Sequence, residues 1–135
     1  MTEDSKTSTP ILAIILLCIA FGLALLTAWG PTLGHISDPQ WTAHQQFHAF
    51  REIFLASVFS ITGIIFCLGP LRKGKSNVLA LVAILGFGVV GGFWVGLPIT
   101  GVGKDDWRPY ANHGLQLATL LAGLVIARYV PQKGN

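Results

Sequence analysis

The chain has 135 residues, of which 52% are hydrophobic and 11% are charged, and its formal net charge is +3. A soluble domain carries about a quarter charged residues, so this composition excludes an ordinary soluble protein and indicates one that resides in a lipid bilayer. The positive charge does not indicate nucleic-acid binding, because Lys and Arg stand singly or in short groups at the ends of apolar runs. We expect one transmembrane domain over residues 1–135, with the bilayer as its main partner.

The first two membrane spans are predicted at residues 11–29 and 39–68. The first contains no charged residue, and about 20 residues at 1.5 Å each cross a hydrocarbon core of roughly 30 Å. Gly30-Pro31 is expected to end it. Asp38 is expected to cap the second helix with Pro39 in its first turn, and Gly69-Pro70 is expected to end it.

The third and fourth spans are predicted at residues 78–98 and 113–129. Gly88, Gly92 and Gly96 follow one another at four-residue spacing in the third span, and small residues in that register let helices approach closely in lipid. We therefore interpret them as a helix-packing surface, used inside the protein or between copies in a homo-oligomer. The sequence thus predicts an all-α, four-helix transmembrane bundle.

The distribution of basic residues predicts the orientation of this bundle. One side carries six of them: Lys6, Arg72, Lys73, Lys75, Arg128 and Lys133. The other side carries Lys104 and Arg108, which Asp38, Asp105 and Asp106 offset. Short basic loops stay on the cytoplasmic side, so both termini are expected in the cytoplasm and the chain is expected to be a multi-pass protein of the inner membrane.

The two halves of the chain resemble each other around their non-cytoplasmic loops. Pro31, Gly34 and Asp38 recur as Pro98, Gly101 and Asp105, each 67 positions further along. Two tandem helical hairpins would be related by a pseudo-twofold axis along the membrane normal. The alternative is that helix ends at an interface acquire such residues independently, because caps and helix breakers favour them.

Histidines are the most distinctive feature of the sequence, since all four, His35, His44, His48 and His113, fall at the outer ends of the predicted spans. His44 and His48 share a helix face with Arg51 and Glu52. Charged residues within a membrane segment usually face the bundle interior or a watery cavity. We therefore expect a polar pocket between the second and fourth spans.

Further members of this pocket are expected from the neighbouring segments. They are Arg51, Asn112, Gln116 and His35. Glu52 is expected to accept a hydrogen bond from His48, and Arg51 to reach His44 or the amides of the fourth span.

Four functions fit the pocket. His44, His48 and His113, with Glu52 as ligand or outer partner, would suit a transition metal. His48 and His113 would ligate a haem from opposite helices, although bulky phenylalanines crowd His48. His48 and Glu52 would form an acid–base pair acting on a lipid-like substrate such as a quinone, sterol or isoprenoid. In a purely structural or interaction protein, these side chains would cap helix ends and reach the interface without any ligand.

Two resemblances accompany these hypotheses. The segment W-x-x-H-x-x-F-H, at Trp41, His44, Phe47 and His48, resembles small four-helix bacterial membrane proteins, which implies the four-span topology and no particular activity. The His48–Glu52 spacing loosely resembles that of membrane isomerases of the emopamil-binding type.

The sequence favours a small membrane protein that binds a metal or small ligand in this pocket, for example as an accessory subunit beside partner membrane subunits. The membrane enzyme acting on a lipid-like substrate and the purely structural or interaction protein are the alternatives.

Overall fold

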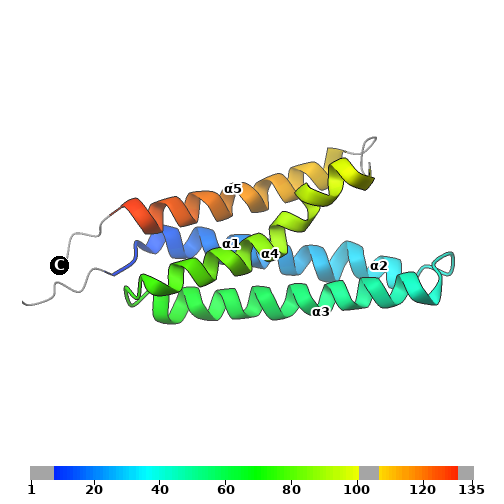
Figure 1. Cartoon of the computed structure of the whole chain (residues 1–135), viewed down its shortest axis with the longest axis horizontal. Helices are drawn as coiled ribbons and strands as arrows, with labels where there is room; N and C mark the ends of the chain where they lie inside the picture. The colour runs from blue at the N-terminus through cyan, green and yellow to red at the C-terminus, as the bar shows by residue number, and fades with distance from the viewer. Residues whose placement is uncertain (1–7, 101–106, 131–135) are drawn as a thin grey trace, which may run out of the picture.

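The computed structural model describes residues 8–100 and 107–130, and within them the chain is all-α. Its long helices are α1 (Ile11–Thr27), α3 (Ala43–Phe66), α4 (Asn77–Thr100) and α5 (Trp107–Tyr129), packed as the bundle of Figure 1. Four helical stretches of the described residues are long and apolar enough to cross a membrane: Ile11–Thr32, Ala43–Leu71, Asn77–Gly96 and Trp107–Tyr129. The predicted fold class, a four-helix bundle of candidate membrane helices, is confirmed.

The bundle has two distinct ends. At one, the terminal end, α1 begins and α5 finishes beside the turn between α3 and α4 (Figure 1). At the other, the histidine end, α3 and α5 begin, and the helical turns there carry all four histidines. Arg72, Lys73 and Lys75 lie in the turn at the terminal end, close to the last turn of α5. This arrangement is the one that the charge distribution predicted, while the side of the membrane to which each end belongs stays a prediction.

Of the two Gly-Pro pairs, Gly30-Pro31 does not end its helix, contrary to the sequence prediction, whereas the helical stretch that contains Gly69-Pro70 ends at Leu71, directly after the pair. Each pair lies inside a π-helical turn, η1 (Ala28–Thr32) after α1 and η2 (Cys67–Leu71) after α3. A proline in an α-helix lacks a donor and its ring clashes with the carbonyl four residues earlier. A π turn inserts one residue and widens this interval, so Pro31 and Pro70 are accommodated and the first helix continues into α2 (Leu33–Ile36).

The start of α3 also differs from the prediction, because Thr42 caps this helix. The Thr42 side chain accepts from the Gln45 amide, and the Gln45 side chain accepts from the Thr42 amide at 2.8 Å. This capping box satisfies two backbone donors that a helix start leaves open. Asp38 instead stabilises a preceding turn, in which its carboxylate accepts from the Gln40 amide at 2.8 Å. The helix therefore begins at Ala43 rather than at Pro39.

The third and fourth helices are longer than predicted. α4 runs to Thr100 with Pro98 inside it, and α5 begins at Trp107, six residues before the predicted start at 113. Pro109 falls in the first turn of α5, where backbone donors have no helical partner.

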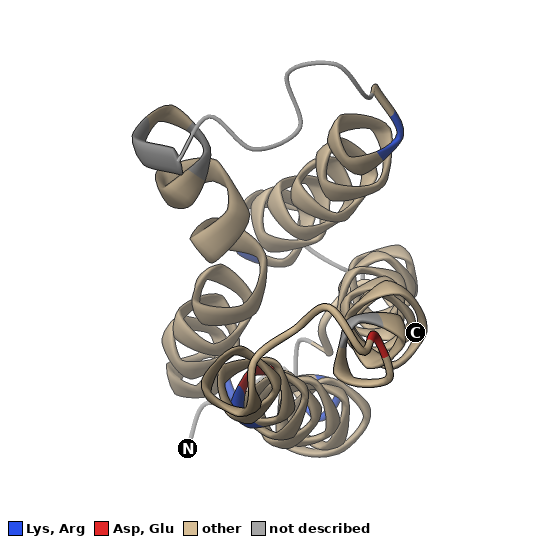
Figure 2. Ribbon diagram, turned by 90° about the vertical axis from the view of Figure 1, so that its right-hand side faces the viewer, with Lys and Arg blue, Asp and Glu red and all other residues tan. Residues whose placement is uncertain are grey.

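The helices are arranged around a ring in the order α1, α3, α4 and α5, as Figure 2 shows from the histidine end. Within the described residues α3 and α5 occupy opposite corners and their backbones are not neighbours, whereas α1 also approaches α4. A twofold axis that exchanges α1 with α4 and α3 with α5 would preserve these neighbours. The duplication itself stays a prediction, since this order is also usual for antiparallel bundles.

Helix α1 supplies more of the described core residues than any other helix. Buried residues of α1 pack against the other helices: Ile14, Leu17, Ala20 and Phe21. Close approach depends on glycines of the partner helices: a Cβ at Gly63 of α3 would overlap the Phe21 ring, and one at Gly123 of α5 would lie 2.8 Å from Leu17. Cys18 and Cys67 are unpaired, and Cys67 is fully buried in the same core.

A small polar network joins α1 to α5 at the histidine end. The Thr27 hydroxyl accepts hydrogen bonds from the Asn112 amide at 2.7 Å and the Gln116 amide at 2.8 Å, and it donates to the Leu23 carbonyl at 2.8 Å. The Gln116 side chain is buried, so its amide depends on this hydroxyl. The network fixes the register between the two most extensively packed helices.

A candidate ligand cleft between α3 and α4

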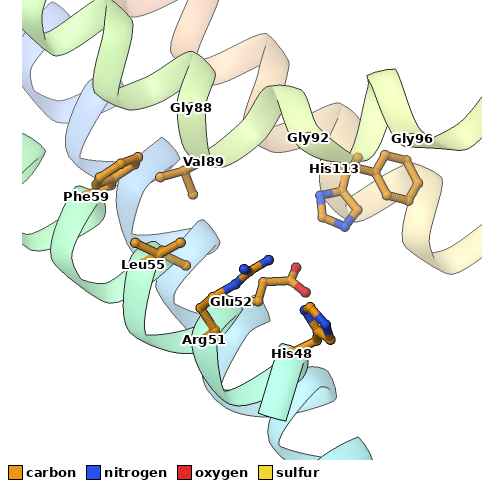
Figure 3. A pocket seen from close by; sticks show the side chains of 12 residues that line it. His48, Arg51, Glu52, Leu55, Phe59, Gly88, Val89, Gly92, Gly96 and His113 are labelled. Carbon is orange, nitrogen blue, oxygen red and sulfur yellow. The ribbon is translucent and has the colours of Figure 1, made fainter. Parts of the chain in front are cut away.

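A cleft of about 700 Å³ lies between α3 and α4 in the histidine half of the bundle (Figure 3). One wall is formed by α3, from His48 to Phe59, and the opposite wall by α4, from Gly88 to Gly96. His113 of α5 completes the lining. Because α3 and α4 are neighbours in the ring, the cleft opens on the side of the bundle, where the bilayer would lie.

The cleft exists because α4 diverges from α3 toward the histidine end of the bundle, as Figure 1 shows. At Gly88 the two helices are still close, since a Cβ there would lie 3.3 Å from the Phe59 ring. One and two turns further on, a Cβ at Gly92 or Gly96 would meet no described heavy atom within 4 Å. Gly88 thus lies at a close approach of α3 and α4, whereas Gly92 and Gly96 line the open part of the cleft. The helix-packing role of the three glycines stays a prediction.

The polar wall of the cleft consists of charged side chains from α3. Arg51 and Glu52 project from α3 into the space facing α4 (Figure 3). Among the described residues, neither makes an ion pair or hydrogen bond. Adjacent residues on a helix point about 100° apart, which explains why the two opposite charges do not satisfy each other.

His48 is paired with His44 rather than with Glu52. The two Nε2 atoms are 3.0 Å apart and the rings meet edge to face. One imidazole donates and the other accepts in such a contact, so at least one of the two is neutral. The predicted hydrogen bond between His48 and Glu52 is absent from the described part of the chain, because His48 turns back along α3 toward the preceding helical turn.

His113 reaches the cleft from α5. Its ring stacks on Phe93 of α4 with centroids 3.9 Å apart and planes 14° from parallel. Its Nδ1 is buried and has no hydrogen-bond partner in the described residues. His48 and His113 therefore border the same cavity from two helices that lie at opposite corners of the bundle.

Other residues predicted for the pocket lie elsewhere. Asn112 and Gln116 donate to Thr27 on α1, outside the cleft lining. Their amides face the helix that α5 packs against, and Arg51 does not reach them. The side chain of His35 lies outside the described residues.

No group of three or more His, Cys, Asp or Glu side chains in residues 8–100 and 107–130 is placed to hold a metal ion. His44 and His48 are close to each other, but His113 does not join them as a third ligand. The structure therefore shows no preformed histidine metal site in the described part of the chain.

Sequence reasoning missed the apolar floor of the cleft. It is formed by Leu55, Ala56, Phe59, Val89 and Phe93. Leu55 and Phe59 follow His48 and Glu52 at helical spacing, so periodicity assigns them to one face. Periodicity does not identify α4 as the opposite wall, because that depends on how the helices diverge.

The cleft thus combines an apolar floor, an open side, and charged or polar groups at one end. Such a cavity suits an amphipathic molecule with a polar group at the histidine end and an apolar part toward Phe59. No protein-family model, curated protein or solved structure matches this chain.

Proposed function

We propose that this protein binds a lipid-like amphiphile in the cleft between α3 and α4. The observation that carries the proposal is the cleft itself, which opens sideways between two candidate membrane helices and has Arg51 and Glu52 on its wall. An unpaired charged side chain in a candidate membrane helix is costly, and on insertion scales the cost reaches about 2.5–3.5 kcal/mol at the centre of the span. A ligand whose polar groups pair with Arg51 and Glu52 would offset this cost and explain why the helix contains these two residues.

The metal and haem hypotheses find less support. The haem hypothesis requires a free ring nitrogen on His48, but the Nε2 of His48 contacts that of His44 at 3.0 Å. The metal site requires His113 to converge with these two histidines, and no group of three such ligands occurs among the described residues. A small organic ligand is therefore the better candidate for the predicted outer pocket.

Binding is also favoured over catalysis. An acid–base mechanism with His48 and Glu52 acting together would be supported by a hydrogen bond between them, and His48 is instead paired with His44. We accordingly propose a lipid-binding membrane protein, acting alone or as an accessory subunit. The positive-inside rule predicts that the cleft mouth lies on the outer side of the inner membrane, because the basic turn at 71–77 lies at the opposite end of the bundle.

The experiment compares two neighbouring glycines of α4. A Cβ at Gly91 and one at Gly92 would both meet no described atom within 4 Å, but only Gly92 lines the cleft. Gly92→Leu should fill the cavity, whereas Gly91→Leu adds the same side chain outside it. Wild-type and variant proteins are extracted in native polymer nanodiscs, transferred to detergent, and examined by native mass spectrometry for retained lipid.

The expected result is one retained amphiphile per chain in the wild type and in Gly91→Leu, with a loss of at least about tenfold in Gly92→Leu. Equal retention by both variants would refute the cleft as the binding site. Circular dichroism and gel filtration of both variants verify that each is folded, so a loss of lipid cannot be attributed to unfolding.

A further inference from the structure

We infer that the ligand of this cleft is a zwitterionic phospholipid of the phosphatidylethanolamine type, held by its headgroup at Arg51 and Glu52. The inference rests on the proposed function and specifies the chemistry of the same site. It follows from the charges in the cleft, their depth along α3, and the shape of the cavity.

The charges of the cleft are complementary to a headgroup that carries both signs. Arg51 offers a guanidinium and Glu52 a carboxylate, and neither has a partner among the described residues. A guanidinium matches the geometry of a phosphate, and a carboxylate accepts hydrogen bonds from an ammonium group. The charges of Arg51 and Glu52 cancel each other, so a ligand of one sign would leave either Arg51 or Glu52 unsatisfied.

The depth of these residues matches the headgroup layer. Ala43–Leu71 has 29 residues, or about 43 Å of helix, which exceeds a hydrocarbon core of about 30 Å by about 13 Å. Arg72 and Lys73 follow Leu71 directly and mark the boundary at the terminal end. The excess, about nine residues, therefore lies at the histidine end and brings the membrane boundary to about Arg51.

The shape of the cleft suits one acyl chain below such a headgroup. Between Glu52 and Phe59 the wall of α3 extends about 10 Å into the apolar layer, and the residues lining it there are apolar. Gly92 on the facing helix leaves room beside them. Since the cleft is open at its side, the second acyl chain can remain in the surrounding bilayer.

A quinone or sterol fits this site less well. Its polar atoms are neutral carbonyl or hydroxyl groups, which can accept from Arg51 but offer Glu52 no cation. A neutral ligand would thus leave a carboxylate without a counter-ion at the edge of the hydrocarbon layer, and such a group is costly there.

The test measures headgroup selectivity with the full-length protein. Delipidated protein in detergent is titrated with phosphatidylethanolamine, phosphatidylglycerol, diacylglycerol and a short-chain ubiquinone analogue, and bound ligand is counted by native mass spectrometry. Wild-type protein should bind phosphatidylethanolamine at least about tenfold more tightly than the other three, because two charge-assisted contacts are made only with that headgroup.

Two single substitutions separate the two contacts. Arg51→Gln should weaken phosphatidylethanolamine and phosphatidylglycerol together, since both carry the phosphate. Glu52→Gln should weaken phosphatidylethanolamine at least about tenfold but leave phosphatidylglycerol unchanged or tighter, which erases the preference. Lys73→Gln, which removes a charge at the terminal end, is the control. This variant should bind the four ligands in the same order of affinity as the wild type.

The outcomes distinguish the inference from the proposed function. If the ubiquinone analogue or diacylglycerol binds best and Gly92→Leu abolishes that binding, the cleft is a lipid site and the headgroup assignment is wrong. If phosphatidylethanolamine is preferred but neither Arg51→Gln nor Glu52→Gln alters the preference, the assignment is likewise wrong. If no ligand shows binding sensitive to Gly92→Leu, the proposed function fails together with it.

Discussion

The Thr27 hydroxyl holds α1 against α5, and a Thr27→Val substitution removes it while preserving the size and branching of the side chain. Two hydrogen bonds between helices are lost, from Asn112 at 2.7 Å and from Gln116 at 2.8 Å. Such bonds in membrane proteins average about 0.6 kcal/mol each and reach about 1.7. The buried Gln116 amide would also remain unsatisfied, so we expect a loss of about 1–3 kcal/mol in the free energy of unfolding.

The measurement is unfolding by sodium dodecyl sulfate in mixed micelles, followed by circular dichroism. Thr119→Val is the matched control, because the described hydrogen bonds of the Thr119 hydroxyl go to carbonyls of its own helix, at Leu115 and Gln116. Thr119→Val should lower the free energy of unfolding by less than about 0.5 kcal/mol, since no contact between helices is lost. A Thr27→Val protein as stable as Thr119→Val would refute the role assigned to the network.

Three further predictions follow from the packing, the histidines and the charges. Gly63→Ala should destabilise the bundle by about 1–3 kcal/mol through overlap with the Phe21 ring, whereas Gly22→Ala, whose Cβ would meet nothing within 4 Å, should cause no loss in the same unfolding assay. Zinc titration by calorimetry should give the same weak binding in wild-type protein and in His113→Ala, because His113 does not converge with the other histidines; tight binding that this substitution abolishes would restore the metal hypothesis. Green fluorescent protein fused after Asn135 should fluoresce and alkaline phosphatase fused there should be inactive, as the basic terminal end predicts, and the reverse pattern would invert the orientation.

The sequence determined the architecture of this protein, because the bilayer imposes the length and polarity of its helices. Apolar segments of about 20 residues become spanning helices whatever their neighbours, since backbone polar groups in lipid must be satisfied within the helix. The grouping of basic residues and of histidines at opposite ends followed from the number of spans alone. The same reasoning identified Arg51 and Glu52, because charges within an apolar helix stand out in any arrangement of the bundle.

Helix boundaries were predicted less well, because local alternatives compete. Pro31 indicates a helix end by its chemistry, but a π turn accommodates it and the helix continues into α2. Pro70 also lies in a π turn, and there the helix ends one residue later, at Leu71. Thr42 and Gln45 form a capping box that outcompetes the Asp38-Pro39 pair. The Thr-x-x-Gln spacing was present in the sequence and could have predicted this start.

Only the tertiary structure decided which side chains share a site. Gly63 and Gly92 look alike in sequence, yet one contacts Phe21 and the other borders the cleft. Likewise, Gln116 was expected beside Arg51 and instead bonds to Thr27. Helix periodicity fixes the face on which a residue lies, but the angle and separation of neighbouring helices depend on side-chain packing along their whole length. The cleft arises from the divergence of α4 from α3, a property of the assembled bundle and of no single segment.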